Sequence, residues 1–477
     1  MIAVLQLLSM GILIYFLLYC AATGVLLAVS LRKISWYARG QEPVRTRPEQ
    51  LAHRPSVSLV APAYNEETLI VQSASAFLAS DYTPLEVVVV DDGSRDETFA
   101  RLDKAFDLVS LPLRGTTALQ TARIRGVYIS RRDPRLRVVR KENGGRSDAI
   151  NAGISIARGE LVVITDADGL LEPDAIARST RPFEVHPDTC VAAGGGIRVA
   201  NGSRIVNGRV VAPGVSWRKG VGATQVLEYL RGFFATRVAW SELNGLLIIS
   251  GAFGVFRRDL IIALGGFSSA TLGEDMEMTM RIHRALRPQW KDARVEFVAD
   301  AVCWTEAPDT MGGLRNQRVR WHTGLLDNLR MHWQLLGRAR FGAAGIFAMP
   351  YVVLFEALEP LIEVLGFAIV VTLVVLDAVN WTYLVAFLLI ALLTGEVLSA
   401  MALLIEEIGF RRYHAKDLAR LTTWGFVEAL WFRPALAWWR LKATALALTG
   451  RRPGWGVIPR GEAILEQPAH TVAPLTR

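Results

Sequence analysis

LVVITDAD, at residues 161–168, joins an apolar run directly to two carboxylates. The run has the length and texture of a buried strand, and Asp166 and Asp168 follow where that strand would end. In an open α/β sheet, ligands bind beyond the carboxyl ends of the strands. A carboxylate pair in this place suits a divalent cation that keeps positions open for phosphate oxygens. Taken alone, the same residues also fit an ordinary strand-to-loop turn.

Short apolar runs on either side of this stretch predict an α/β fold. Residues 57–61, 87–90, 136–139 and 190–193 have the same texture, and mixed helical stretches separate them. Parallel strands that are covered by helices on both faces show this pattern. We therefore expect a Rossmann-like, mostly parallel sheet with its ligand at the carboxyl edge. Residues 104–132 contain turn residues and scattered basic side chains, and we interpret them as an inserted excursion.

The composition indicates a soluble part and a membrane-embedded part in one chain. Of the 477 residues, 51% are hydrophobic, 21% are charged and 13 are Trp. Much of the net charge of +8 lies beside apolar segments, where anionic lipid headgroups explain it better than nucleic acid does. Cys20, Cys190 and Cys303 have no metal-type spacing and indicate no disulfide framework, which fits a reducing cytoplasm.

Three segments are apolar over the length that crosses a bilayer, about 20 residues. We expect transmembrane helices at residues 1–31, 349–376 and 381–404. Basic residues follow the first and the last of these helices, so the positive-inside rule places both flanks in the cytoplasm. The N-terminus and the turn at Asp377-Ala378-Val379-Asn380 then lie outside.

The cytoplasmic part divides into four segments. Residues 32–55 are a basic linker, residues 56–310 a catalytic domain, residues 311–345 interfacial helices, and residues 411–477 amphipathic helices and a tail. The last segment mixes Trp and Arg as helices in the membrane interface do, and one extra crossing within residues 418–448 stays open.

Two further motifs follow the first two predicted strands. Ala63-Tyr64-Asn65-Glu66 and Asp91-Asp92-Gly93-Ser94 stand where the sheet would present its ligand edge. A carboxylate there can accept a hydrogen bond from a base or a ribose hydroxyl. Later, Asn143-Gly144-Gly145-Arg146 forms a loop that runs into a helix and supplies a cation. Each motif alone is also ordinary turn chemistry.

Six motifs in this order resemble the family 2 glycosyltransferases. To the four above are added Gly273-Glu274-Asp275 and Gln317-Arg318-Val319-Arg320-Trp321. Within that family the chain looks most like the membrane-embedded synthases of poly-N-acetylglucosamine, hyaluronan, chitin and cellulose. The resemblance covers residues 56–330 and extends more loosely through the later helices to Gly454-Trp455-Gly456. It implies a GT-A catalytic domain.

The resemblance also implies a role for each matching residue. The nucleotide-sugar site would include Ala63, Tyr64, Glu66, Asp91, Asp92, Arg146, Asp166, Gln317, Arg320 and Trp321. Asp91 and Asp92 would hold the uracil and ribose, and Arg146 stands where the family usually has lysine. Asp168, with Asp166, would place Mg²⁺ or Mn²⁺ on the diphosphate. Asp275 matches the general base, with Glu274 beside it.

The transfer chemistry fits these residues. Displacing UDP from the sugar C1 needs a deprotonated acceptor hydroxyl on one face and stabilised negative charge on the other. Asp275 suits the first need, and a metal on Asp168 with the Arg320 guanidinium suits the second. One in-line displacement inverts the anomeric centre. We expect an inverting, metal-dependent hexosyltransferase in the inner (plasma) membrane, multi-pass, that adds UDP-sugar units to a β-linked polysaccharide at the cytosolic face and that could be coupled to export.

Two other functions stay open. A single-addition enzyme that glycosylates a lipid is one alternative, because enzymes that resemble ceramide glucosyltransferase also carry the Gln-x-x-Arg-Trp signature. A non-catalytic nucleotide-binding membrane subunit would keep the nucleotide site but would not need the base. Membrane lipids and a polysaccharide or lipid acceptor are expected partners, nucleic acid is not, and an oligomer or accessory subunit stays open. The sequence does not identify the sugar, the linkage or any translocation of product.

Overall fold

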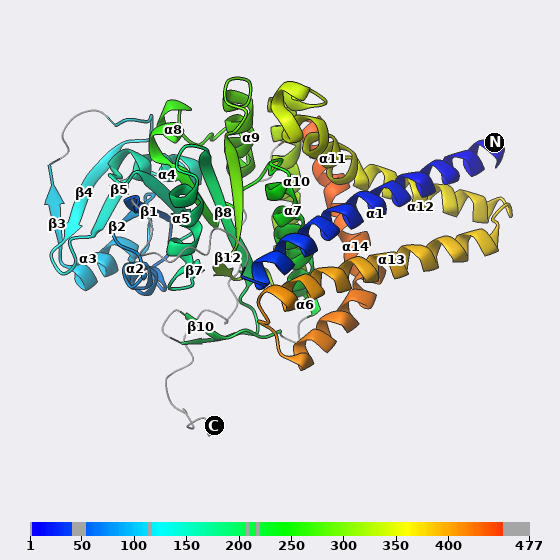
Figure 1. Cartoon of the computed structure of the whole chain (residues 1–477), viewed down its shortest axis with the longest axis horizontal. Coiled ribbons are helices and arrows are strands. Elements are labelled where there is room, and N and C mark those ends of the chain that lie inside the picture. The colour runs from blue at the N-terminus through cyan, green and yellow to red at the C-terminus, as the bar shows by residue number, and fades with distance from the viewer. Residues whose placement is uncertain (1, 41–53, 113–116, 207–208, 216–219, 452–477) are drawn as a thin grey trace.

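The strand at residues 161–165 lies near the middle of a ten-stranded sheet in the computed structural model of the chain (Figure 1). The structure describes residues 2–40, 54–112, 117–206, 209–215 and 220–451. The strand order is β3-β4-β5-β2-β1-β6-β11-β8-β12-β7. The strands are β1 Val57–Ala63, β2 Leu85–Asp91, β3 Leu108–Leu111, β4 Ile124–Ser130, β5 Leu136–Lys141, β6 Leu161–Thr165, β7 Leu170–Leu171, β8 Cys190–Val199, β11 Phe253–Arg257 and β12 Arg294–Thr305. A separate hairpin joins β9 Arg204–Val206 to β10 Arg209–Ala212.

The register of the central strands brings their ends to one edge. β5, β2, β1 and β6 are parallel neighbours, with Ala63 opposite Asp91 at the ends of β1 and β2. β11 runs antiparallel to β6 and starts at the same edge, where Phe253 pairs with Thr165. The residues before β11 therefore lie beside the carboxyl ends of the parallel strands.

Helices cover both faces of the sheet, as the apolar strands predict. On one face α2 Ile70–Leu78, α3 Thr98–Phe106 and α5 Ala175–Val185 share one core with the strands, in which α2 packs on β2 and α5 on β8 and β12. On the other face α4 Arg146–Ile156, α8 Arg258–Ala263 and α9 Glu274–Leu286 share a second core, in which α4 packs on β1 and β2 and α8 on β11. This arrangement confirms the predicted mostly parallel α/β sheet.

The interpretation of residues 104–132 as an excursion misses two strands. β3 and β4 lie in this segment, pair antiparallel with each other, and extend the sheet beyond β5. The two strands form a partly exposed edge of the sheet, so they lack the continuous apolar runs of the central strands. The sequence of this segment therefore resembles that of a loop. The antiparallel strand β11 and the long strand β12 are also absent from the predicted set.

Long apolar helices extend from the sheet domain at its β12 side (Figure 1). Among the described residues, α1 Ile2–Ala38 and α13 Trp381–Gly409 are each long and apolar enough to cross a membrane. The two helices pack against each other, and α12 Glu359–Val375 packs against α1. These candidate spans indicate a membrane protein.

The helix expected at residues 349–376 contains a bend. Helix α11 Met349–Val352 continues into a π-helical turn, Val353–Ala357, and α12 starts at Glu359 after a bend of 40°. Pro360 stands in the first turn of α12, where its missing N–H leaves no helical hydrogen bond unmade. Within the described ranges, the bent pair gives a third candidate span if it is one crossing.

The remaining helices connect the sheet to the spans. They are α6 Gly220–Glu228, a π-helical turn Tyr229–Ala235, α7 Thr236–Glu242, α10 Met311–Met331, short 3₁₀ turns at Trp333–Leu335 and Ala339–Phe341, a π-helical turn at Ala344–Ala348, and α14 Ala415–Leu448. α14 packs on α10, α12 and α13. Gly454-Trp455-Gly456, most of the basic linker and the tail lie outside the described residues.

Candidate active site

Arg146 joins two other predicted site residues, Asp166 and Glu274, in one cluster. It begins α4, and its side chain reaches across the sheet edge to the loop after β6, to the loop before β11 and to the start of α9. Arg146 Nε donates to Asp166 Oδ1 at 2.9 Å, Nη2 forms an ion pair with the same oxygen at 2.8 Å, and Nη2 donates to the Gly251 carbonyl at 2.7 Å. Nη1 forms an ion pair with Glu274.

Asp275 lies next to this cluster at the N-terminus of α9. Its Oδ2 accepts a hydrogen bond from the Gly251 amide at 2.9 Å, and its Oδ1 accepts one from the Met276 amide at 2.8 Å. Gly251 thus binds Arg146 through its carbonyl and Asp275 through its N–H. The acidic motif and the arginine loop, far apart in sequence, share one backbone position. Helix α9 also favours negative charge at its first turn.

Acidic and basic side chains lie close together in the cluster, and their charges and burial shift one another's pKa values. Burial raises the pKa of Glu274, and the negative charges of Asp275 and Asp166 raise it further against the lowering effect of Arg146. Burial alone would lower the pKa of Arg146, but Asp166 and Glu274 reverse this and raise it. Burial also lowers the pKa of Arg320, while Glu274 and Asp166 oppose the shift. Arg320 is therefore within electrostatic reach of the same carboxylates.

Asp92 holds the glycine loop that precedes Arg146. Its carboxylate accepts hydrogen bonds from Lys141 Nζ at 2.6 Å, the Gly144 amide at 3.0 Å and the Gly145 amide at 2.9 Å. Lys141 is completely buried and also pairs with Asp148. Burial raises the pKa of Asp92, and the Lys141 ammonium and the loop amides lower it. Asp92 thus fixes the backbone that delivers Arg146 to the cluster.

The first two motifs interlock at the same edge. Asp91 Oδ1 accepts a hydrogen bond from the Ser94 amide at 2.9 Å, and the Asp92 amide donates to the Ala63 carbonyl at 2.9 Å. The Asn65 amide donates to Ser94 Oγ at 3.0 Å, and the Glu66 amide to Thr98 Oγ1 at 2.8 Å. Tyr64 is exposed beside them. The structure therefore brings both motifs together, next to but distinct from the Arg146 cluster.

Helix α10 carries the last predicted motif past the start of α9. Gly324 of α10 and Gly273 approach so closely that a Cβ on Gly324 would lie 2.8 Å from the Gly273 nitrogen. Asn328 Nδ2 donates to the Gly273 carbonyl at 2.8 Å. This crossing brings Arg320 to the acidic cluster. Gln317 is buried on the same helix.

Trp321 lies on an aromatic group rather than in the acidic cluster. Its ring centroid is 5.4 Å from that of Phe233 and 6.4 Å from that of Tyr229, and the Arg318 guanidinium stacks on it at 4.3 Å. Tyr229 and Phe233 belong to the π-helical turn between α6 and α7. Such turns occur frequently at functional sites.

Asp166 and Asp168 together suit a cation that takes further ligands from a diphosphate. Both lie after β6, and both raise the pKa of buried Cys303 by their charge, after burial itself. No group of three or more His, Cys, Asp or Glu that could hold a metal occurs among the described residues. Mg²⁺ is commonly held by one or two carboxylates with phosphate oxygens and water. The pair fits this pattern, although Asp166 also pairs with Arg146.

Sequence reasoning missed several residues that build the site. Lys141 holds Asp92 and Asp148 in place, and Tyr229 and Phe233 support Trp321. Lys141 ends an otherwise buried strand, where a charged residue needs a partner, and this signal could have identified it. The other residues act through partners distant in sequence.

Comparison with known proteins agrees with the motif order. Residues 58–265 match the family model described as Glycosyl transferase family 2, and residues 268–449 match the model described as Chitin synthase. The first match contains the motifs up to Asp166-Ala167-Asp168, and the second contains Gly273-Glu274-Asp275 and Gln317 to Trp321. The expected family resemblance is confirmed.

Individual relatives are similar over different lengths. The poly-beta-1,6-N-acetyl-D-glucosamine synthase of Staphylococcus aureus strain COL is 25% identical over 268 residues, which cover 56% of this chain and 54% of that synthase. The chain thus spans about half the length of that relative. The synthase of the same name from Staphylococcus epidermidis is 24% identical over 390 residues, 80% of each chain. The chain is also similar to the solved mannosyltransferase PcManGT from Pyrobaculum calidifontis in complex with GDP-Man and Mn²⁺, with 20% identity and a TM-score of 0.47. This similarity covers 92% of this chain and 100% of the mannosyltransferase chain.

Proposed function

We propose that this chain, which carries a glycosyl transferase family 2 domain at residues 58–265, transfers a sugar from a UDP-sugar to a growing β-linked polysaccharide with inversion. The single observation that supports this most is the cluster of Arg146, Asp166, Glu274 and Asp275 at the carboxyl edge of the sheet. The relatives named as poly-beta-1,6-N-acetyl-D-glucosamine synthases make N-acetylglucosamine the first sugar to test.

Asp275 acts as the general base. Each of its carboxylate oxygens accepts one backbone N–H, which fixes the orientation of the group and leaves a lone pair on each oxygen for an acceptor hydroxyl. Arg146 neutralises Glu274 beside it, so the second carboxylate adds less repulsion when Asp275 holds its negative charge. The base therefore has both a fixed direction and a counter-charge nearby.

Positive charge at the other side of the cluster stabilises the leaving diphosphate. The guanidinium of Arg320 is within electrostatic reach of the same carboxylates, and together with the charge of Arg146 it would make this edge of the sheet favourable for an anion. Asp168 and Asp166 would hold Mg²⁺ or Mn²⁺, which when bound supplies further positive charge to the diphosphate. Asp91 and the loop fixed by Asp92 would form the nucleotide end of the site.

The reaction takes place at the cytosolic face of the inner membrane. Arg411, Arg412 and Lys416 follow α13, and the positive-inside rule places this end in the cytoplasm together with the sheet domain. We propose α1, the bent pair at residues 344–375 and α13 as the spans of a multi-pass protein. The acceptor end would rest near Trp321, beside the membrane helices.

The defining experiment measures UDP release and product length. The full chain, purified in lipid nanodiscs, is given UDP-N-acetylglucosamine, UDP-glucose or UDP-glucuronate with Mg²⁺ or Mn²⁺. We expect metal-dependent UDP release with one donor and a ladder of products. One sugar on a lipid would indicate the single-addition alternative, and donor binding without transfer to any acceptor would indicate a non-catalytic subunit.

Replacing the proposed base provides the first prediction. Asp275→Asn keeps the size of the side chain but removes the proton acceptor, so we expect turnover to fall by at least about 100-fold while UDP binding persists. The measurement is kcat together with UDP affinity by calorimetry. Asp259→Asn is the matched control, because the Asp259 side chain is 95% exposed on α8. Unimpaired turnover in Asp275→Asn would remove this residue from the base role.

A further inference from the structure

A chain of ion pairs joins the cytoplasmic end of α13 to the sheet domain. Arg198, near the end of β8, pairs with Glu406 of α13 at 2.6 Å, and both side chains are 1% exposed. Arg412, just after α13, lies 3.6 Å from the other oxygen of Glu406 and forms a 2.5 Å ion pair with Glu172. Buried charges of this kind persist only when they are paired.

Glu172 stands directly behind the loop that carries Asp166 and Asp168. The loop leaves β6 at Thr165, turns through a hydrogen bond from the Gly169 amide to the Asp166 carbonyl at 3.0 Å, and enters β7. β7 pairs with the end of β12, and Trp304 of β12 donates to Glu172 Oε1 at 3.2 Å. Glu172 therefore fixes the far end of the loop, four residues after Asp168.

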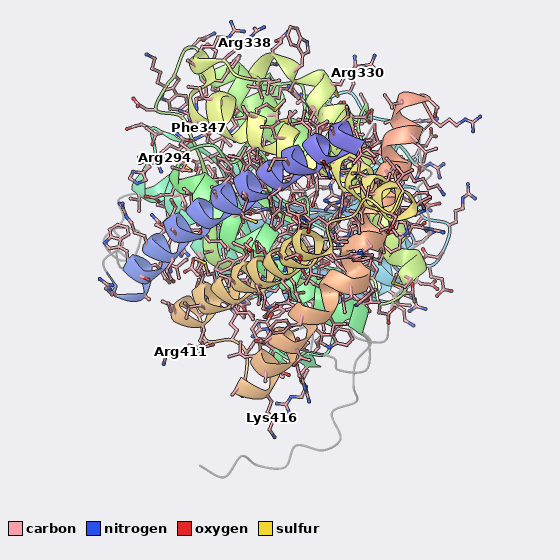
Figure 2. The ribbon with its side chains drawn as sticks, turned by 90° about the vertical axis from the view of Figure 1, so that its right-hand side faces the viewer. Arg294, Arg330, Arg338, Phe347, Arg411 and Lys416 are labelled. Atoms are coloured by element: carbon pink, nitrogen blue, oxygen red, sulfur yellow. The ribbon has the colours of Figure 1, made fainter. Side chains whose placement is uncertain are left out.

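Arg412 differs from its basic neighbours in direction. Figure 2 shows Arg411 and Lys416 at the periphery of the molecule, where the turn from α13 to α14 meets solvent. Both are exposed, as charged residues next to a membrane helix commonly are. The Arg412 side chain is only 13% exposed and points to the two glutamates. Topology alone would not require a buried arginine in this turn.

We propose that Arg412 is a positioning residue for the Asp166–Asp168 loop: through Glu172 it holds the two carboxylates in place from the end of a membrane helix. The proposal rests on the proposed function, because the carboxylates matter as ligands of a metal bound to UDP. The order of contacts is α13 to Arg412, Arg412 to Glu172, and Glu172 to the loop. A shift of α13 against the sheet would therefore reach the metal ligands directly.

A purely structural role for Arg412 makes a different prediction. If the ion pairs only dock the sheet on the helices, their loss lowers stability and leaves metal affinity unchanged. If they position the loop, their loss weakens the binding of Mn²⁺ with UDP before it changes the fold. Residues that orient metal ligands typically contribute about 10- to 100-fold to metal affinity.

The experiment measures Mn²⁺ binding in the presence of UDP by electron paramagnetic resonance, on the full chain in nanodiscs. Arg412→Met keeps the apolar stem and removes the charge, and Glu172→Gln keeps an acceptor for Trp304 and removes the charge that faces Arg412. We expect each variant to weaken Mn²⁺ binding by about tenfold and to raise the donor KM more than it lowers kcat. Arg412→Lys should recover part of the loss, because an ammonium can reach one carboxylate.

Two controls make the result decisive. Lys33→Met removes a 3.0 Å ion pair between α1 and Glu242 of α7, a comparable link that does not touch the loop, and should leave Mn²⁺ affinity unchanged. The double variant Arg412→Met with Glu172→Gln should bind Mn²⁺ no more weakly than either single variant, because each substitution breaks the same ion pair. Wild-type Mn²⁺ affinity in Glu172→Gln and Arg412→Lys overturns the proposal, even if Arg412→Met fails to fold. Binding of Mn²⁺ with UDP needs no turnover, so a failure of the proposed transfer reaction is seen separately.

Discussion

Arg146 is the residue on which the site geometry depends most. Its guanidinium makes two contacts with Asp166, one with Glu274 and one with the Gly251 carbonyl. These partners lie 20, 128 and 105 positions away in the chain. The planar fork of an arginine matches this set, whereas an ammonium is a point charge with fewer fixed directions.

Arg146→Lys should therefore impair the site although it keeps the charge. Each lost charge-assisted hydrogen bond costs about 1.5–3 kcal/mol, so we expect kcat/KM for the donor to fall at least about tenfold. Steady-state kinetics with the active UDP-sugar provide the measurement. Arg125→Lys is the control, because Arg125 is 55% exposed and its ion pair with Glu142 is long, at 3.9 Å. Equal kcat/KM in the two variants would mean that the fork geometry is unimportant.

The sequence indicates which residues belong to the site more reliably than it indicates which residues they contact. The motif order placed Asp166, Glu274 and Asp275 in one predicted site, and the structure brings Asp166 and Glu274 to Arg146 and Asp275 to the Gly251 amide beside it. It did not show that Asp92 would bind Lys141 and two loop amides, because those contacts depend on how β2, β5 and the loop meet in space. Whether these residues bind nucleotide and metal stays a prediction.

At the scale of elements, the crossing of α9 and α10 decides where Arg320 lies. The two helices approach through Gly273 and Gly324 and are joined by the Asn328 amide. A glycine inside a helix costs up to about 1 kcal/mol relative to alanine. The glycine at position 324 is explained by its close contact with Gly273, which leaves no space for a methyl group.

Gly324→Ala tests this crossing. A Cβ would lie 2.8 Å from the Gly273 nitrogen and 3.0 Å from the Leu272 carbonyl carbon, so α10 must move away from the acidic cluster. We expect a loss of about 1–3 kcal/mol in the free energy of unfolding and a fall in kcat of at least about tenfold. Gly312→Ala on the same helix meets nothing within 4 Å and should keep both values or gain stability. Thermal unfolding and turnover of the two variants decide the matter.

The sequence predicts correctly those strands that are apolar because they are buried on both faces. It does not predict elements whose form depends on their position in the folded structure. Strands β1, β2, β5 and β6 are buried on both faces and were recognisable as apolar runs. Edge strands β3 and β4 lack that signal, and a hydropathy average over about 20 residues passes over the bend at residues 357–359, although Glu356, Glu359 and Pro360 stand beside it. Hydropathy measures length and polarity, and it carries no direction.

For the whole molecule, the long helices define two opposite ends. Figure 1 shows the N-terminal end of α1 and the turn between α12 and α13 at the end far from the sheet. The other ends of α1 and α13 reach the sheet domain, where Lys33 pairs with Glu242 of α7 and Glu406 with Arg198. If the helices span a membrane, the turn at residues 376–380 and the sheet domain lie on opposite sides of it.

Cysteine labelling of intact cells tests this topology. Ala378→Cys places a thiol in the turn, and Asp259→Cys places one on the exposed surface of the sheet domain. The natural cysteines Cys190 and Cys303 are buried and Cys20 is partly buried, so the unmodified chain serves as the background. We expect a membrane-impermeant maleimide to label Ala378→Cys in intact cells and Asp259→Cys only after permeabilisation, since positive residues flank the domain side of both spans. Labelling of Asp259→Cys in intact cells would place the sheet domain outside, where cytosolic UDP-sugar could not reach the site.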